Sequence, residues 1–303
     1  MTTLNSKNET LNGVLDGLMR RYQERVPDVE AIFQAMTRGG LIERPEDIEN
    51  DHIAFRTMGV PQLGVASLEK IFLHLGYERR DAYAFPGKKL EAFWYSPPEP
   101  QLPRIFISEL RVNELSDEAQ KLIRSYTDEV TSDPVDALDL GSAAEIDSFL
   151  HRALWRLPSY EDFQTLASES EYAAWVIYNR YYLNHFTVSV HNLPEGFSTV
   201  ASFNAFLEAH GFKLNDSGGK AKESPDGLLV QSSTVAEMIG ATFAGGDTHQ
   251  ISGSYVEFAE RRPLPEHQGK AKAELTRAER REGFEASNAD KIFESTYSAQ
   301  TGR

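Results

Sequence analysis

Two histidines and one glutamate each lie in a segment with the pattern of a buried β-strand. His52 lies in NDHIAFR at residues 50–56, and His185 lies in NHFTVSVH at residues 184–191. Glu257 stands among apolar neighbours in SYVEF at residues 254–258. Two imidazoles and one carboxylate form the ligand set of nonheme iron sites that keep positions open for other molecules. These residues therefore predict a three-ligand iron site and chemistry with O2.

The two histidine segments belong to an internal repeat. A turn and a helix follow each of them, and the helical segments ASLEKIFLHLGY at 66–77 and ASFNAFLEAHGF at 201–212 align without a gap at an offset of 135 residues. The histidines align within two residues of the same offset. A glycine near the end of each helical segment is typical of a helix C-terminus. The repeat would bring two equivalent strands, each with a histidine, into one structure.

The strands and helices that must position these residues follow from periodicity and turn residues. The first copy is expected as a strand at 52–58, a helix at 67–75 and strands near 77–85, 90–95 and 104–110. The second is expected as a strand from 185, a helix at 199–210 and strands near 212–214, 228–232 and 254–261. The fold class is thus predicted as α+β, with duplicated βαβββ modules forming a curved mixed sheet around a metal site. The expected parts are an N-terminal helical segment (1–45), the first module (46–112), a helical insertion (113–183), the second module (184–265) and a C-terminal tail (266–303).

Arg56 is the candidate for binding an anionic substrate. Residues four apart on a strand share a face, so Arg56 and His52 point the same way, roughly 13 Å apart at about 3.3 Å per residue. A guanidinium binds a carboxylate through two parallel hydrogen bonds. A short diacid could therefore bind the metal at one end and Arg56 at the other. In isolation, an arginine is more often part of a structural ion pair.

Other polar residues compete for these roles. Among the remaining histidines, His191 shares a face with His185 but lies near a strand end, and His249 lies in a loop that could close over a site. The others are expected to be structural or exposed: His74, His151, His210 and His267. Glu260, beside two arginines, is expected in solvent. Glu109 lies on the counterpart strand of the first module, and as a fourth ligand it would indicate a lyase or isomerase rather than an oxygenase.

Composition narrows the class of protein. The 303 residues carry a net charge of −15, which disfavours binding to nucleic acid or to an anionic membrane. No cysteine is present, so disulfides and thiolate metal sites are excluded. No run of 18 apolar residues and no apolar leader segment is seen, which favours a cytoplasmic protein. The tail is expected to be charged and partly helical, with GF at 283–284 and IF at 292–293 packed against the rest.

The arrangement of these motifs resembles known proteins. The βαβββ duplication resembles the vicinal oxygen chelate fold, and YVEFAER at 255–261 resembles the last-strand motif of 4-hydroxyphenylpyruvate dioxygenase-type enzymes. The motifs DHIAFR at 51–56, NHFT at 184–187 and LPRIFISEL at 102–110 resemble the 2-oxoadipate dioxygenase/decarboxylase family over nearly the whole chain. The resemblance implies that His52, His185 and Glu257 bind Fe(II) and that Arg56 binds the distal carboxylate of the substrate.

The resemblance implies a nonheme Fe(II) dioxygenase that converts a small 2-oxo diacid, O2 being the second substrate. The implied reaction is the conversion of 2-oxoadipate to (R)-2-hydroxyglutarate and CO2, a step of lysine breakdown. Two alternatives stay open on the same fold. One is a metal-dependent hydrolase, lyase or isomerase that uses a bound water, and the other is a non-enzymatic small-molecule binding protein. The sequence leaves the native metal, the exact substrate and the oligomeric state undetermined.

Overall fold

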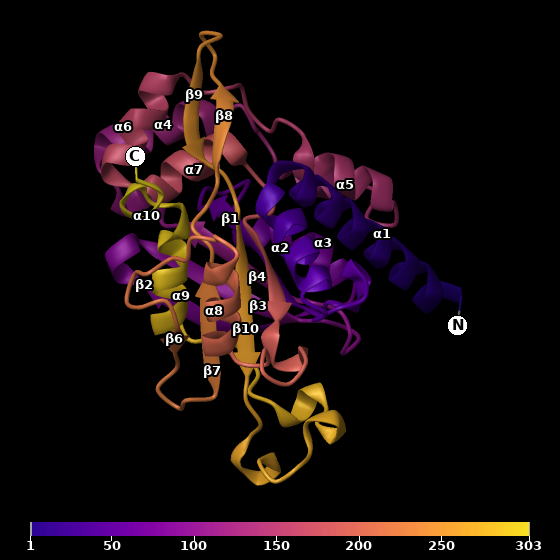
Figure 1. Cartoon of the computed structure of the whole chain (residues 1–303). Coiled ribbons are helices and arrows are strands. Elements are labelled where there is room, and N and C mark those ends of the chain that lie inside the picture. Colours follow the sequence, from indigo (N-terminus) through magenta and orange to yellow (C-terminus); the bar gives the residue numbers. More distant parts are fainter. Residues whose placement is uncertain (1, 303) are drawn as a thin grey trace.

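The computed structural model describes residues 2–302 as ten helices and ten strands among shorter 3-10 turns (Figure 1). The helices are α1 (Thr2–Arg25), α2 (Pro27–Arg38), α3 (Val65–His74), α4 (Asp117–Thr127), α5 (Ala143–His151), α6 (Tyr160–Glu169), α7 (Glu171–Asn179), α8 (Val200–Ala209), α9 (Ala286–Ile292) and α10 (Ser298–Thr301). The strands are β1 (Asn50–Met58), β2 (Glu78–Phe85), β3 (Leu90–Ser96), β4 (Arg104–Leu110), β5 (His185–Ser189), β6 (Lys222–Glu223), β7 (Leu229–Ser233), β8 (Met238–Thr242), β9 (Thr248–Ser252) and β10 (Tyr255–Arg261).

One mixed sheet of eight strands shows the duplication directly. Its strand order is β2-β3-β4-β1-β5-β10-β7-β6, so the first copy fills one half and the second copy fills the other. In each half the first strand pairs in parallel with the last, as β1 with β4 and β5 with β10. The halves meet where β1 and β5 run antiparallel. The two strands that carry the histidines are therefore neighbours at the centre of the sheet, and the predicted α+β class is confirmed.

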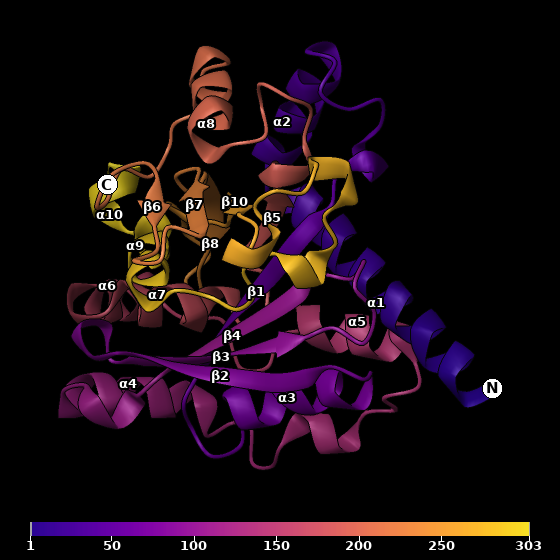
Figure 2. The same cartoon turned by 90° about the horizontal axis from the view of Figure 1, so that it is seen from below.

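The repeat helices lie outside the two halves. Figure 2 shows α3 and α8 on opposite sides of the view, each beside its own half of the sheet. They begin at residues 65 and 200 and end at residues 74 and 209, an offset of 135 at both ends. Both β1 and β5 are buried along nearly their whole length, although polar residues such as His52, Arg56 and His185 alternate with apolar ones in their sequences. Those buried polar side chains need partners, and they are the ones that form the site.

The helical insertion packs beside the first half, where α7 contacts β1, whereas α2 packs on β10 and β5 of the second half, with the Phe33 and Phe186 ring centroids 6.1 Å apart. Serine side chains cap several insertion helices, as where Ser142 accepts a hydrogen bond from the Glu145 amide at the start of α5. Arg21 of α1 forms an ion pair with Asp147 of α5 at 2.9 Å. The Trp175 indole of α7 donates to the Gly253 carbonyl at 2.8 Å and so ties the insertion to the chain just before β10. Trp155, Trp175 and Tyr181 of the insertion are buried and form part of its packing.

The C-terminal tail passes between the two halves of the sheet. In Figure 2 its yellow ribbon, with α9, lies between the second half and α7. Phe284 packs against the His52 ring with centroids 4.7 Å apart, and Phe293 packs against Phe85 at 5.1 Å. Both tail phenylalanines are buried, and they close one side of the concave face of the sheet.

The second copy departs from the expected strand pattern. The strand expected at 212–214 is reduced to an isolated bridge between Leu214 and Thr234, and β6 comes later in the chain. The hairpin of β8 and β9 interrupts the copy between β7 and β10 as a separate two-stranded sheet. Over residues 2–302, no helix is both long and apolar enough to cross a membrane.

Candidate metal centre

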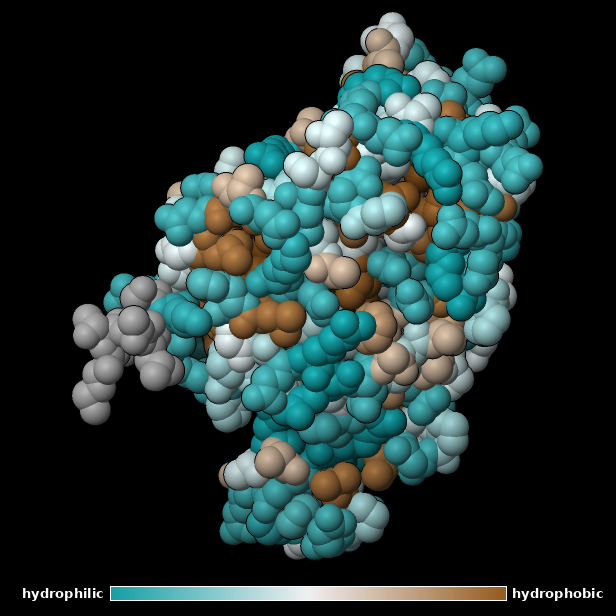
Figure 3. Space-filling view, turned by 180° about the vertical axis from the view of Figure 1, so that it is seen from behind, coloured by the Kyte–Doolittle hydropathy of each residue, from teal (hydrophilic) through white to brown (hydrophobic). Residues whose placement is uncertain are grey.

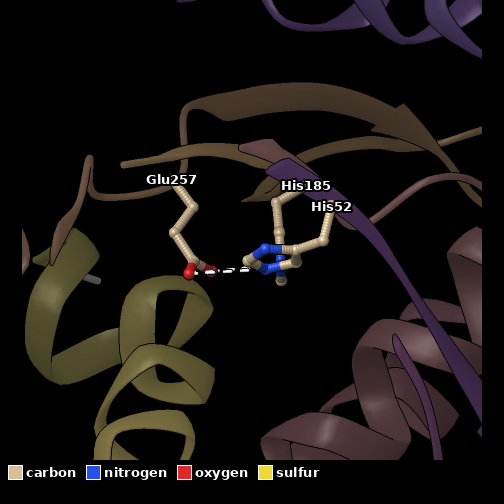
Figure 4. Close-up of side chains that lie close together, drawn as sticks. All are labelled: His52, His185 and Glu257. Atoms are coloured by element: carbon tan, nitrogen blue, oxygen red, sulfur yellow. Dashed lines mark hydrogen bonds and ion pairs between the residues drawn. The ribbon is translucent and has the colours of Figure 1, made fainter. Parts of the chain in front are cut away.

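His52, His185 and Glu257 converge on one point of the concave face, although they come from three strands (Figure 4). The Nε2 atoms of the two histidines are 3.3 Å apart. Glu257 places Oε1 at 3.4 Å from His52 Nε2 and Oε2 at 3.1 Å from His185 Nε2. All three residues are buried. Among the residues that the structure describes, this is the only cluster of three or more His, Asp or Glu side chains with the spacing of a metal site.

Strand register explains how residues so distant in sequence meet. In the antiparallel pair of β1 and β5, His185 lies opposite Ala54, two residues from His52 and on the same face. In the parallel pair of β5 and β10, Glu257 lies opposite Thr187. The three side chains therefore leave the same face of three adjacent strands. A shift of one residue in either pairing would point a ligand to the opposite face.

Hydrogen bonds at the other ring nitrogens set the orientation of the two imidazoles. His52 Nδ1 lies 2.8 Å from Asp51 Oδ1, and His185 Nδ1 lies 3.2 Å from Asn184 Oδ1. Because both partners are acceptors, each Nδ1 carries the proton and each Nε2 presents a lone pair. Gln231 donates to Glu257 Oε1 at 2.7 Å and fixes the carboxylate. Three electron-pair donors thus face one another at a buried point, an arrangement that a cation stabilises.

The spacing of the donor atoms fits a metal ion. Imidazole nitrogens and carboxylate oxygens bind divalent transition metals at about 2.0–2.2 Å. Two such ligands at right angles around one ion would lie about 3.0 Å apart by that geometry. The observed 3.1–3.4 Å separations are close to this value. Two histidines and one carboxylate on a single face of the ion leave the opposite positions open.

Electrostatics at the site depend on a buried ion network beneath His52. Arg261 donates to both oxygens of Asp51, at 2.7 and 2.9 Å, and Arg104 donates to Oδ2 at 3.2 Å. Burial alone would raise the pKa of Asp51, but the two guanidiniums outweigh it and hold that pKa well below its usual range. Asp51 is thus an anion, and its Oδ1 accepts a hydrogen bond from His52 Nδ1–H.

The pKa values of the three converging groups reflect burial and mutual attraction. Burial lowers the pKa of His185 to about 3, against the opposing attraction of Glu257. For His52, burial lowers the pKa, but Glu257 and Asp51 together outweigh it and raise the pKa above its ordinary value. Burial raises the pKa of Glu257, and the two histidines reverse this into a net lowering. A charged carboxylate and a neutral His185 are the protonation states that metal binding needs.

Arg56 lies on the same face as His52, as the strand alternation predicts. Its Nη1 donates to Thr296 Oγ1 at 2.9 Å, and its Nη2 donates to the Phe293 carbonyl at 3.0 Å. The Arg56 Nε and the hydroxyl of Tyr255 are both buried without a hydrogen-bond partner. The cavity beside them has a volume of about 20 Å3, enough for about one water. Arg56 and Tyr255 both line this cavity next to the metal cluster, and the Arg56 guanidinium is near enough to the Tyr255 hydroxyl to oppose the rise in pKa that burial causes there.

The structure separates Glu109 from the site. His52 is paired with Arg104 and His185 with Tyr255, so the register counterpart of Glu257 in the first copy is Phe106, not Glu109. Glu109 points to the other face, where it accepts a hydrogen bond from the Val65 amide at 2.7 Å. Among residues 2–302, no fourth carboxylate or imidazole joins the cluster. The fourth ligand that would favour a lyase or isomerase is thus missing from the described part of the chain.

The structure also shows where Glu260, His249 and His191 lie relative to the cluster. Glu260 was expected in solvent, and this was wrong, because its side chain is buried, accepts from the Val200 amide at 2.8 Å and pairs with Arg262. His249 lies on the β8–β9 hairpin and stacks on the Tyr160 ring at 3.5 Å, away from the cluster. His191 is buried after β5 and accepts from the Arg261 amide at 3.2 Å, also outside the cluster.

Comparison with known proteins decides the family. The family model described as 2-oxoadipate dioxygenase/decarboxylase matches residues 14–274. The chain belongs to the 2-oxoadipate dioxygenase/decarboxylase family. It is 45% identical to the 2-oxoadipate dioxygenase/decarboxylase of Arabidopsis thaliana, over 96% of this chain and 78% of that protein. The expectations of this family and of an enzyme of dioxygenase/decarboxylase type are confirmed.

Solved structures agree with this assignment. A crystal structure of the hydroxyglutarate synthase from Oryza sativa in complex with 2-oxoadipate is 41% identical, with a TM-score of 0.89, over 99% of this chain and 95% of that one. A putative glyoxalase superfamily protein from Ralstonia eutropha is 22% identical, with a TM-score of 0.69, over 89% of this chain and 83% of that one. The second likeness concerns the fold alone and agrees with the predicted vicinal oxygen chelate-like architecture.

The comparison contradicts the expected location of the protein. The curated relatives from Arabidopsis and Oryza sativa are named chloroplastic and chloroplastic/amyloplastic, and the second is 43% identical over 96% of this chain and 79% of that protein. A cytoplasmic location was inferred from the absence of an apolar leader segment. That reasoning was wrong, because such a segment directs secretion, whereas organelle transit peptides are amphipathic and lack it.

Proposed function

We propose that this chain is an Fe(II)-dependent dioxygenase that converts 2-oxoadipate and O2 to 2-hydroxyglutarate and CO2, a step of lysine breakdown. The observation that carries the proposal is the buried convergence of His52 Nε2, His185 Nε2 and a Glu257 carboxylate within 3.4 Å of one another. The family and the 2-oxoadipate complex of the Oryza sativa relative support the choice of substrate. The reaction balances, since the C1 carboxylate leaves as CO2 with its own oxygens, the two atoms of O2 account for the new carboxylate oxygen and the hydroxyl of 2-hydroxyglutarate, and no other oxidant is needed.

In this proposal His52, His185 and Glu257 hold the ferrous ion. The ion would supply the activation of O2 and would polarise the 2-oxo acid group of the substrate. Iron is favoured over a purely Lewis-acidic metal because the reaction consumes O2. Asp51 and Asn184 keep the imidazole lone pairs directed at the ion, and Gln231 does the same for the carboxylate.

Arg56 would bind the distal carboxylate of 2-oxoadipate. Its Nε and the Tyr255 hydroxyl are buried donors that lack partners, and both belong to residues lining the cavity beside the cluster. A carboxylate between them would satisfy both groups, which removes the cost of leaving them unbonded. Tyr255 is a residue that sequence reasoning did not assign to the site, although it stands two positions before Glu257 on the same face of β10.

The tail would act as the wall that closes over the substrate. The cavity of about 20 Å3 is too small for a six-carbon diacid, so the segment at 284–296 must shift when the substrate enters. Two of the contacts that hold this segment are the hydrogen bonds from Arg56 to Phe293 and Thr296. A carboxylate that competes for this guanidinium would release them. Phe284 and Phe106 then exclude water from the reacting centre.

A comparison of two diacids under defined metal conditions tests the proposal. The metal-free chain is loaded anaerobically with Fe(II), and O2 uptake is followed after addition of 2-oxoadipate or of 2-oxoglutarate, which is one carbon shorter. We expect uptake with 2-oxoadipate, matched by CO2 release, and much slower uptake with 2-oxoglutarate. Absence of O2 uptake with 2-oxoadipate, in a sample where bound Fe(II) is measured, would reject the proposed reaction.

A further inference from the structure

A strongly basic cavity lies at the end of β10, between the turn at Val190–Asn192 and the loop that follows the strand. This loop is the lowest part of the molecule in Figure 1, and from behind its surface is mostly hydrophilic (Figure 3). The cavity has two adjoining parts of about 270 and 80 Å3, which share His191, Arg261, Leu275 and Arg280. It is separate from the cavity at the metal cluster, with which it shares no lining residue.

The charge of this cavity is opposite to that of the whole chain. Cationic side chains outnumber carboxylates five to one in the larger part, where the cations are Arg261, Arg262, Lys270, Lys272 and Arg280, and the carboxylate is that of Glu260. The smaller part adds Arg104 and Arg277 against Glu49. A chain with a net charge of −15 has thus gathered cations around one hollow, which raises the local concentration of anions.

Two of these cations lack a carboxylate partner. Arg262 is paired with Glu223 and Glu260, and Lys270 with Glu279. Arg280, by contrast, is only 6% exposed and makes no ion pair within residues 2–302, and its guanidinium donates from Nη1 to the Arg261 carbonyl at 2.9 Å. Lys272 likewise has no ion pair there and donates to the Leu193 carbonyl. Glu49 attracts Arg280 without forming an ion pair with it, and burial still lowers the pKa of Arg280. A buried guanidinium without a direct ion pair is costly unless another group supplies a negative charge.

His191 adds a buried imidazole to the same wall. Its Nδ1 lies 3.2 Å from the Arg261 backbone nitrogen and 3.3 Å from the Ala259 carbonyl oxygen. The side chain is 7% exposed, and no hydrogen bond to Nε2 is formed by the described residues. Burial lowers the pKa of His191 to about 3, which keeps the ring neutral at physiological pH.

We propose that this cavity is a binding site for a small anion with two or more negative charges, held by Arg280 and Lys272 beside the imidazole of His191. The ligand group would be a phosphate or a cluster of carboxylates, because a guanidinium binds both through paired hydrogen bonds. The larger part, with a volume of about 270 Å3, has room for a small phosphorylated or polycarboxylate metabolite. This site does not depend on the proposed metal centre.

Isothermal titration of the whole chain with pyrophosphate, inorganic phosphate and citrate tests the proposal. We expect saturable binding of at least one of these anions, weakened roughly 10-fold or more by Arg280→Met, the usual effect of losing a hydrogen bond to a charged group. Lys272→Gln, at an exposed position, provides a second variant with little risk to folding. Stronger binding of pyrophosphate than of citrate would identify phosphate as the group recognised, and the reverse would identify carboxylates.

Two controls separate this site from other anion sites. Lys220→Gln removes the same charge from an exposed pair with Glu208 and should leave the affinity unchanged. Arg56→Gln alters the proposed substrate site and should also leave it unchanged. The proposal would be overturned by the absence of saturable binding for all three anions. It would equally be overturned by affinity that is lost in Arg56→Gln and kept in both Arg280→Met and Lys272→Gln.

Discussion

The substitution Asp51→Asn tests the support beneath the metal cluster. Asp51 accepts hydrogen bonds from His52 Nδ1 on one side and from the guanidiniums of Arg261 and Arg104 on the other. An asparagine has one acceptor and one donor end. In either orientation its amide NH2 group faces a donor, either the imidazole N–H or a guanidinium, and the charge that balances the arginines is gone.

The expected size of the effect follows from these contacts. Removing the partner of a metal-binding imidazole typically weakens metal affinity about 10–100-fold, or roughly 1.4–2.7 kcal/mol. Leaving a buried guanidinium without its carboxylate costs about 3–5 kcal/mol of folding stability. Arg104 keeps Glu282 as a second partner, so the lower end of that stability range is expected. The loss of Fe(II) affinity should be measurable in Asp51→Asn protein that is still folded, so it cannot be explained by the loss of folding stability alone.

Two measurements are needed for Asp51→Asn. Anaerobic calorimetric titration with Fe(II) gives the metal affinity of the folded protein, and urea unfolding of the metal-free protein gives the stability. Asp136→Asn is the matched control, because Asp136 forms an exposed ion pair with Lys70 far from the cluster in sequence and should change neither quantity. Unchanged Fe(II) affinity in a folded Asp51→Asn protein would refute the role given to Asp51.

Three further predictions concern Arg56, Phe284 and Glu109. Arg56→Gln should raise the KM for 2-oxoadipate about 10–150-fold, because a hydrogen bond to a charged group contributes about 1.5–3 kcal/mol. The affinity for Fe(II) should stay constant. An unchanged KM would reject the role of Arg56 in binding the substrate. Phe284→Ala removes a buried ring beside His52 and should cost about 3–5 kcal/mol in urea unfolding, so a loss below 1 kcal/mol would contradict the packing described. Burial and the neighbouring Glu91 raise the pKa of Glu109 from 4.5 to about 7. The folded chain therefore holds that proton more tightly than the unfolded chain. The stability that this group contributes is fully present below pH 4.5 and is lost as the pH rises to about 7. Glu109→Gln should therefore flatten this part of the plot of unfolding free energy, measured with urea, against pH. An identical slope in both proteins would show that Glu109 does not titrate in this window.

The central part of the fold could be predicted from the sequence, because the helices and strands of the repeat show regular spacing of apolar residues. The gapless alignment of the α3 and α8 segments, and the buried-strand pattern of the segments around His52 and His185, place the two copies side by side. Alternation along β1 placed Arg56 on the face of His52, and alternation along β10 separated Glu257 from Glu260. These are local rules with periods of two and 3.6 residues, so a single sequence suffices.

Other features depend on pairing between distant segments, which no local pattern encodes. Glu109 seemed to be the counterpart of Glu257 because both lie on the last strand of a module, but the registers of β1–β4 and β5–β10 make Phe106 the counterpart. Glu260 looked exposed beside two arginines, yet the start of α8 covers it. The β8–β9 hairpin and the late position of β6 are insertions into one copy, so the repeat could not predict them.

The residues that surround the metal ligands could likewise not be predicted from the sequence. Arg261 and Asp51 are 210 positions apart, and only the folded sheet brings them within hydrogen-bond distance. The tail could be expected to pack because of its apolar pairs, but not to pack on His52 itself. A single sequence therefore gave the candidate ligands and left their surroundings to the structure.

We propose that the cluster of His52, His185 and Glu257 binds one Fe(II) and supports oxidative decarboxylation of 2-oxoadipate. A limited-oxygen experiment tests this most directly. The chain is loaded with one equivalent of Fe(II) under argon, mixed with 2-oxoadipate, and given a measured amount of O2 below the amount of substrate. We expect no CO2 before O2 is added. After its addition, the amounts of O2 consumed, CO2 released and 2-hydroxyglutarate formed should be equal. The Glu257→Gln variant should consume no O2 and form neither product. Conversion under argon, or full activity in Glu257→Gln, would contradict it.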